Sequence, residues 1–207
     1  MAVSFDLFGT LVDVDRPADP AEAVAEALRD RDVAVPDDWA AAYREVHIDA
    51  PAGAEVPLPA HVSAALQSRG VDAPGNAPRR AVVSAFDPEV RTREGAVAAV
   101  EAAREQGPVA LCSNCAVPEL VGRTLVRSDL GRGDFDTIVT SVACGWRKPD
   151  AHIFETVARQ LDCDVEALVH VGDDPGTDGG ITDAGGRFVD IAETPLGSLP
   201  VELGWSG

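Results

Sequence analysis

The chain has 207 residues, of which 45% are hydrophobic, enough to bury the core of one α/β domain that carries a modest insertion. Its 35 acidic residues outnumber its 17 basic ones and give a formal net charge of -18. Such a chain repels phosphate-rich surfaces, so we expect no binding to nucleic acid and none to anionic membranes.

Five short apolar runs are typical of strands buried on both faces, because each is almost continuously hydrophobic. They span residues 3–8, 109–113, 137–140, 167–172 and 187–191. Segments with one apolar helical face, residues 117–130 and 151–161, separate the later strands. The alternation predicts an α/β fold with a doubly wound, Rossmann-like parallel sheet, whose ligands bind at the carboxyl ends of the strands.

The long segment between the first two of these strands has a different pattern. Proline-containing breaks divide it into helical stretches, which we expect over residues 20–31, 37–48, 59–68 and 78–86. A further helix over residues 94–106 returns the chain to the sheet. We therefore predict a core domain made of residues 1–14 and 92–207, with an all-helical cap domain over residues 15–91.

The start of the chain runs directly into the first strand and lacks the basic region that opens a signal peptide. No stretch approaches the roughly 20 apolar residues of a membrane span. Cys112 and Cys115 form a CxxC, but no second CxxC completes a zinc site. A cytoplasmic protein with reduced thiols is the expectation.

Two strand ends carry polar side chains that point to chemistry. Asp6 stands at the end of the first strand, and Gly9 after it permits a turn that a side chain would resist. Ser113 and Asn114 end the second apolar strand just before a helix, an arrangement that suits a phosphate. Each feature alone also fits an ordinary turn or helix cap.

Two further segments are charged. Lys148 is the only lysine of the chain, yet it stands at a loop-to-helix junction, in the sequence Trp-Arg-Lys-Pro-Asp. Asp173, Asp174 and Asp178 gather at and beyond a strand end, where their repulsion calls for a cation. Hard oxygen ligands of this kind suit Mg²⁺, although a solvated acidic loop is the simpler alternative.

Taken together and in this order, the four segments resemble the motifs of the haloacid dehalogenase-like superfamily. Its pattern is an Asp-x-x-x-Thr strand end, a strand ending in Ser or Thr, a Lys-Pro before a helix, and a Gly-Asp with a further Asp. All four are present, and the resemblance spans the chain. The family's doubly wound sheet, with a helical cap entering after the first motif, agrees with the organisation predicted above.

The resemblance implies a role for each matching residue. Asp6 would be the nucleophile that forms a covalent aspartyl intermediate, with Ser113 and Lys148 as its catalytic partners. Thr10, Ser113 and Asn114 would contact the substrate. Asp6, Asp173 and the backbone carbonyl of Phe8 would hold Mg²⁺, with Asp174 and Asp178 around them. The implied function is Mg²⁺-dependent hydrolysis of a small phosphate monoester.

One departure leaves two alternatives open. Phosphatases of the family carry a second Asp two positions after the nucleophile as general acid and base, and here that residue is Phe8. An aromatic residue there resembles the haloacid dehalogenases, which need no acid and no metal, but those enzymes lack the Gly-Asp kept at Asp173. The alternatives are therefore a metal-free 2-haloacid dehalogenase, and a catalytically weak member that binds a ligand or partner.

The charge pattern also suggests an environment. An acidic chain almost free of lysine resembles proteins of salt-loving organisms, where salt screens self-repulsion over a Debye length of about 3 Å near 1 M. We expect a halophilic protein, with an ordinary acidic cytosolic protein as the alternative.

Overall fold

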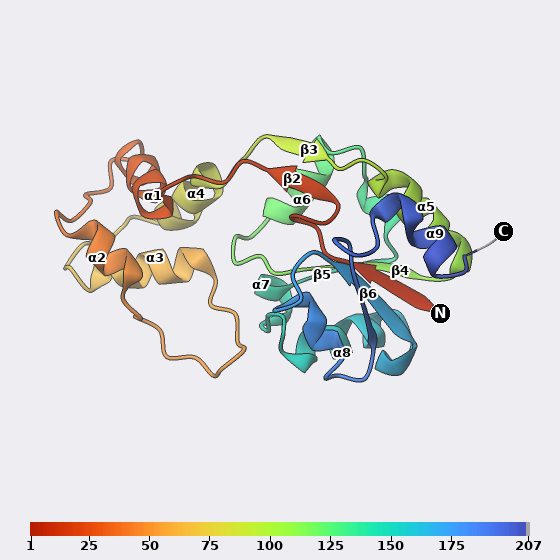
Figure 1. Ribbon diagram of the computed structural model, residues 1–207. Helices are drawn as coiled ribbons and strands as arrows, with labels where there is room; N and C mark the ends of the chain where they lie inside the picture. Colours follow the sequence, from red (N-terminus) through yellow and green to blue (C-terminus); the bar gives the residue numbers. More distant parts are fainter. Residues whose placement is uncertain (206–207) are drawn as a thin grey trace.

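The computed structural model describes residues 1–205, and Figure 1 shows its two unequal parts: a sheet with flanking helices and a group of four helices beside it. The sheet has five parallel strands in the order β5-β4-β1-β6-β7. These are β1 (Ala2–Phe5), β4 (Val109–Ser113), β5 (Thr137–Thr140), β6 (Leu168–Gly172) and β7 (Arg187–Asp190). The predicted doubly wound α/β fold is confirmed.

Alternate side chains of the strands enter two separate cores. On one face of the sheet, Ala110 and Cys112 of β4 pack with α8 (Ala151–Gln160). On the other face, Val109 and Leu111 pack with α5 (Ala96–Gln106), α6 (Leu120–Arg127) and the short α9 (Leu199–Glu202). Since every residue of β1, β4 and β6 is buried, these central strands are almost continuously apolar in the sequence.

The helices beside the sheet come from residues 20–85. They are α1 (Pro20–Arg29), α2 (Trp39–Arg44), α3 (Leu58–Gln67) and α4 (Ala77–Ala85). Three of them lie close to the ranges expected from the sequence, whereas α2 is shorter at both ends than the expected residues 37–48. The loop before α3 reaches the sheet part, where Glu55 accepts a hydrogen bond from the Ser141 hydroxyl at 2.6 Å. Leu58 also donates its backbone N–H to the Ala116 carbonyl at 2.9 Å. The chain therefore fastens the helices to loops at the carboxyl ends of the strands.

Two short elements lie where the chain passes between these parts. β2 (Val12–Val14) and β3 (Val90–Thr92) pair as an antiparallel ribbon, which the sequence analysis did not foresee. Three residues per strand are too few to show an alternating pattern. The remaining short helices are α7 (Ser141–Cys144) and the 3₁₀ turns Arg132–Asp134, Val165–Ala167, Asp178–Ile181 and Leu196–Ser198.

The first strand is shorter than predicted, ending at Phe5 and not at Phe8. Leu7 then accepts backbone hydrogen bonds from both Leu11 and Val12, which folds residues 7–12 into a tight turn. Leu7 and Leu11 are fully buried in that turn, so their hydrophobicity resembles that of a strand. The turn places Asp6 at the very end of the strand.

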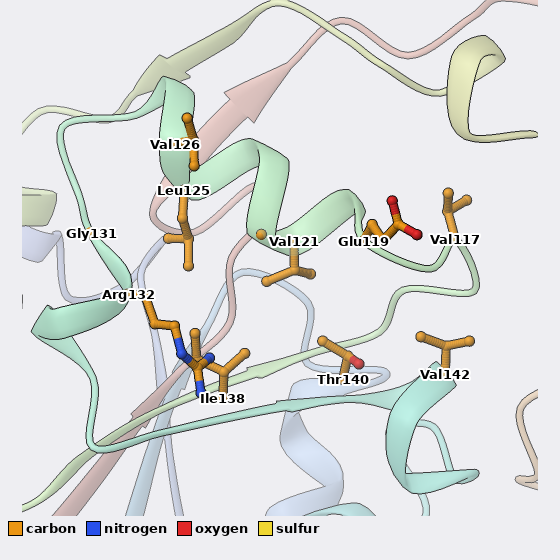
Figure 2. A pocket seen from close by; sticks show the side chains of 11 residues that line it. Val117, Glu119, Val121, Leu125, Val126, Gly131, Arg132, Ile138, Thr140 and Val142 are labelled. Atoms are coloured by element: carbon orange, nitrogen blue, oxygen red, sulfur yellow. The ribbon is translucent and has the colours of Figure 1, made fainter. Parts of the chain in front are cut away.

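A groove runs along the outer strand of the sheet, between α6 and β5. Val121 and Leu125 of α6 point toward Ile138 of β5 across a space of about 400 Å³ (Figure 2). None of the residues proposed from the sequence for the active site lines this groove. Within residues 1–205, no helix has the length and apolar character needed to cross a bilayer.

Candidate active site

The carboxyl ends of three neighbouring strands bring the polar residues together. Asp6 directly follows β1, Ser113 ends β4, and Asp173 follows β6. Because β1 lies between β4 and β6 in a parallel sheet, these residues meet at one edge. Asp6 and Ser113 are buried there, whereas Asp173 is exposed.

Lys148 is the buried cation of this site, with only 2% of the residue exposed. Its ammonium group donates to Asp6 Oδ1 at 2.7 Å, to Asp178 Oδ1 at 2.5 Å and to the Cys112 carbonyl at 2.9 Å. These three acceptors use all three ammonium protons. Within residues 1–205, Asp6 Oδ2 has no hydrogen-bond partner, so this oxygen is left free for chemistry.

A second layer of buried hydrogen bonds holds Asp178. His170, in the middle of β6, is fully buried and donates from Nε2 to Asp178 Oδ1 at 3.0 Å. Its Nδ1 accepts a hydrogen bond from the hydroxyl of Ser4 on β1 at 2.8 Å. Neither His170 nor Ser4 was assigned a role from the sequence. A polar residue inside an otherwise apolar strand was the available signal for this network. Its hydrogen bonds link Ser4, His170, Asp178 and Lys148 in that order.

Burial and charge set the protonation of this network. Burial raises the pKa of Asp6 to about 6, and Asp178 adds to this although Lys148 opposes it. Burial also lowers the pKa of His170 to about 4, so the ring is neutral. For Lys148, burial acts to lower the pKa, but Asp6 and Asp178 outweigh it and the pKa lies above its ordinary value. The result is one stable cation between carboxylates.

The turn after Asp6 is shaped to receive Asp173. Gly9 has a φ of +97°, and a Cβ added there would lie 2.4 Å from Asp173 Oδ2. Any other residue would both strain the backbone and collide with the carboxylate. Thr10 is fully buried and donates its hydroxyl to Asp173 Oδ1 at 2.8 Å. Thr10 was predicted to contact substrate, and the structure instead directs its hydroxyl to Asp173.

Ser113 and Asn114 differ in what their side chains do. The Ser113 hydroxyl is buried and has no hydrogen-bond partner among residues 1–205. A buried, unsatisfied hydroxyl costs roughly 1–3 kcal/mol unless a ligand or water pairs with it. The Asn114 amide is already occupied: it donates to the Lys148 carbonyl at 2.9 Å and accepts from the Lys148 N–H at 2.8 Å. Asn114 thus fixes the lysine loop.

Asp174 stabilises the turn that follows it in the sequence. Its carboxylate accepts hydrogen bonds from the Gly176 N–H at 2.8 Å and from the Thr177 hydroxyl at 3.0 Å. Its backbone N–H in turn donates to Asp178 Oδ2 at 3.1 Å. Asp174 therefore shapes the turn that delivers Asp178 to Lys148.

The carboxylates fit a divalent cation. Asp6, Asp173 and Asp178 each offer an oxygen within 4.8 Å of those of the other two. Lys148 supplies a single positive charge against them. No hydrogen bond within the described chain uses the Phe8 carbonyl, which stands in the turn beside Asp173. Hard oxygen donors with excess negative charge are what Mg²⁺ prefers.

A carboxylate with a free oxygen beside a buried lysine and an acidic cluster can attack an electrophile and hold a cation. The model of the haloacid dehalogenase-like hydrolases matches residues 1–180, and the chain belongs to this family. A search among curated proteins found no match.

Solved structures of similar fold include a 2-haloacid dehalogenase and a protein bound to a phosphorylated ligand. A 2-haloacid dehalogenase from Pseudomonas syringae pv. Tomato is 21% identical, with a TM-score of 0.65 and 99% of each chain covered. CbbY from Rhodobacter sphaeroides, in complex with xylulose-1,5-bisphosphate, is 20% identical, with a TM-score of 0.59 and coverage of 90% and 84%.

A family enzyme from Bacteroides thetaiotaomicron, in complex with magnesium and inorganic phosphate, is 16% identical, with a TM-score of 0.60 and coverage of 91% and 92%. At such identities these likenesses show the fold.

Proposed function

We propose that this hydrolase is a Mg²⁺-dependent phosphatase, which acts on a small phosphate monoester through an aspartyl-phosphate on Asp6. The observation that carries the proposal is the charge of the site. Asp6 and Asp178 share the one ammonium group of Lys148, and Asp173 brings a third carboxylate within 4.8 Å of theirs. The negative charge left over favours a divalent cation and, with it, the anionic group that a cation attracts. The dehalogenases of the family lack the Gly-Asp that this chain keeps at Asp173.

The contacts of each residue suggest its role in the reaction. Asp6 Oδ2 attacks phosphorus, the bond from phosphorus to the leaving oxygen breaks, and a water molecule later hydrolyses the acyl phosphate to free Asp6. Lys148 holds Asp6 Oδ1 and stabilises the ionised carboxylate before attack and again once the acyl phosphate has been hydrolysed. The Ser113 hydroxyl donates to a phosphate oxygen, which satisfies its missing hydrogen bond.

The metal belongs at the acidic cluster. Asp6, Asp173 and the Phe8 carbonyl would hold Mg²⁺, and Asp178 would act through Lys148 and the surrounding waters. When bound there, Mg²⁺ offsets the negative charge of the transferring phosphoryl group. Thr10 keeps Asp173 oriented for this purpose, since it occupies Oδ1 and leaves Oδ2 available.

The organisation of the chain belongs to the same proposal. Residues 15–91 act as a cap over the core formed by residues 1–14 and 92–207, because the helices of this segment pack mainly on one another. Both connections between the proposed cap and core run side by side in the β2–β3 ribbon. A location in the cytoplasm fits four cysteines that form no disulfide in the described chain.

A 2-haloacid dehalogenase is the second candidate, and Phe8 is the observation that favours it. Phe8 is half-buried beside the catalytic edge and replaces the acid that would protonate an alkoxide leaving group. Halide needs no such proton. A weak family member that only binds a ligand or partner is the third candidate.

The deciding experiment compares the wild type with Asp6→Asn and, as a matched control, with Asp183→Asn, an exposed aspartate outside the site. We expect phosphate release that requires Mg²⁺ in the wild type and the control, and none from Asp6→Asn, which is neither a nucleophile nor an anionic ligand. Metal-independent halide release from 2-chloropropionate would establish the dehalogenase. Tight binding of phosphate esters without any turnover would establish the third candidate.

A further inference from the structure

A cavity of about 440 Å³ opens next to the catalytic edge, between the helical segment and the sheet. Phe8 and Asn114 form part of its wall on the sheet side, and Leu58, Phe86 and Pro88 contribute apolar surface from the opposite side. The cavity has the size of a site for a small metabolite. Because it adjoins Asp6 through Phe8, it can hold the part of a substrate that is not transferred.

The charged residues that line the cavity form no ion pairs with one another. Two carboxylates line it, and both are neutralised by arginines outside it: Asp15 pairs with Arg91 at 2.9 Å, and Asp87 pairs with Arg127. These hydrogen bonds lower the pKa of both carboxyl groups, so each stays ionised and committed to its own arginine.

Arg16 is the cation that remains. It lines the cavity, is exposed, and makes no ion pair or side-chain hydrogen bond within residues 1–205. Asn114 and Cys115, which directly follow Ser113, line the same cavity as Arg16. In a chain with twice as many acidic as basic residues, an arginine left without a carboxylate partner beside an apolar pocket is available to a ligand.

We propose that Arg16 binds an anionic group on the leaving part of the substrate, and that this hydrolase prefers organic phosphates whose short, mostly carbon body ends in a carboxylate or a second phosphate. The inference rests on the proposed phosphatase function for the identity of the transferred group. The apolar walls of the cavity favour a hydrocarbon leaving part, and the guanidinium of Arg16 favours a negative charge at its far end.

Binding measured without turnover tests this inference. Asp6→Asn is titrated by calorimetry with saturating Mg²⁺, at one KCl concentration, using three esters. The phosphate ester of 3-hydroxypropionate carries a carboxylate at its far end, 3-methylbutyl phosphate has the same shape with an uncharged far end, and propane-1,3-diol bisphosphate carries a second phosphate. We expect one of the two esters with a charged far end to bind about 10-fold or more tightly than 3-methylbutyl phosphate, as charge-assisted hydrogen bonds allow.

The same titrations in the Asp6→Asn background with Arg16→Ala or Arg16→Gln should abolish that preference. Arg44→Ala, which removes an exposed arginine of the helical segment that does not line the cavity, should keep it. Equal preference with and without Arg16, in variants with unchanged melting temperature, overturns the inference.

Failure of the phosphatase proposal has a different signature: none of the esters binds, or the wild type turns none of them over. The wild type and Arg16→Ala are then titrated with 2-chloropropionate. Weaker binding to Arg16→Ala supports the assignment of Arg16 to an anionic group, and equal binding overturns it.

Discussion

Lys148 donates a hydrogen bond to Asp6 Oδ1 at 2.7 Å, although the two residues stand 142 positions apart in the chain. Asp178, on the far side of the ammonium group, accepts a second hydrogen bond at 2.5 Å. A buried cation between two buried carboxylates is stable only when all three are present, because removal of one leaves an uncompensated charge. Under the proposed mechanism, the reactivity of Asp6 therefore depends on Lys148, and this dependence can be tested.

Replacement of Lys148 by Arg should lower kcat on the order of 10²-fold or more, the cost typical of losing one well-placed donor. The planar guanidinium is larger and cannot reproduce three convergent hydrogen bonds in a site that is 2% exposed. Steady-state rates of a folded variant at saturating Mg²⁺ provide the measurement. Full activity would show that the ammonium group is incidental.

Mg²⁺ should change the pH dependence of the reaction. Burial raises the pKa of Asp6 to about 6 without metal, and the nucleophile must be ionised, so activity at limiting Mg²⁺ should fall below about pH 6. Metal binds the ionised carboxylates, so proton and cation compete and the acidic limb should move to lower pH as Mg²⁺ approaches saturation. Rate profiles for p-nitrophenyl phosphate at several Mg²⁺ concentrations measure this. An acidic limb that does not move would argue against metal ligation by Asp6.

His170 should make stability depend on pH. Burial lowers its pKa from 6.5 to about 4, so between these values the unfolded chain holds a proton that the folded chain lacks. The stability contributed by the neutral ring is therefore present at pH 7 and is lost as the pH falls through this window, by up to about 1.4 kcal/mol per pH unit.

His170→Asn cannot gain this proton. The deficit in its free energy of unfolding relative to the wild type should therefore shrink from pH 7 to pH 5. Urea unfolding of both proteins with a chelator present measures the difference. Comparison with the wild type removes the opposing contribution of Asp6, which both proteins share. A deficit that is constant with pH would mean that the ring does not titrate in this range.

The fold was predictable because its central strands are buried on both faces. Val109 and Leu111 face one core while Ala110 and Cys112 face the other, so all the residues are apolar and the strand boundaries can be read directly. The end of the first strand was misplaced because Leu7 and Leu11 are buried in a turn, and hydrophobicity alone does not separate a turn from a strand. The β2–β3 ribbon depends on pairing between residues far apart in sequence, which no local pattern shows.

The candidate site was predictable as a set of residues but not as a set of contacts. Strand ends and the single lysine pointed to Asp6, Ser113, Lys148 and Asp173. Hydrogen-bond partners are set only when the chain has folded: Thr10 donates to Asp173, and Asn114 holds the backbone of Lys148. The cavity beside Phe8 likewise combines side chains from distant segments, so its size and its charge balance could not be inferred beforehand.

Salt should stabilise this protein if the net charge of -18 reflects adaptation to salt. Molar KCl screens repulsion between surface carboxylates, and each kcal/mol gained should raise the melting temperature by about 2–4 °C. A double variant, Asp49→Asn with Asp183→Asn, removes two exposed charges and should gain stability at low salt but little in molar KCl. A melting temperature that stays flat or falls as KCl rises would remove the halophilic interpretation.

Phe8 should make the wild type sensitive to the leaving group. General acid catalysis is typically worth about 10²–10⁴-fold, and a phosphatase without the acid at this position must expel its leaving group with less help. Nitrophenolate needs little protonation, whereas an alkoxide needs much. The wild type should therefore favour aryl phosphates, unless Asp13 or a group of the substrate supplies the proton.

Replacement of Phe8 by Asp should raise the turnover of alkyl phosphates more than that of aryl phosphates, provided that the new carboxyl group is protonated when the alkoxide departs. The same carboxylate can instead capture Mg²⁺, and loss of the ring removes apolar surface from the cavity wall, so metal affinity and melting temperature are measured on the same variant. The measurement is a series of leaving groups of graded pKa for both proteins at saturating Mg²⁺. If a folded, metal-binding Phe8→Asp variant shows the same dependence on leaving-group pKa as the wild type, Phe8 does not mark a missing acid. Release of halide by the wild type without metal would explain the aromatic residue differently, because a halide leaves without a proton and Phe8 would then stand where no acid is needed.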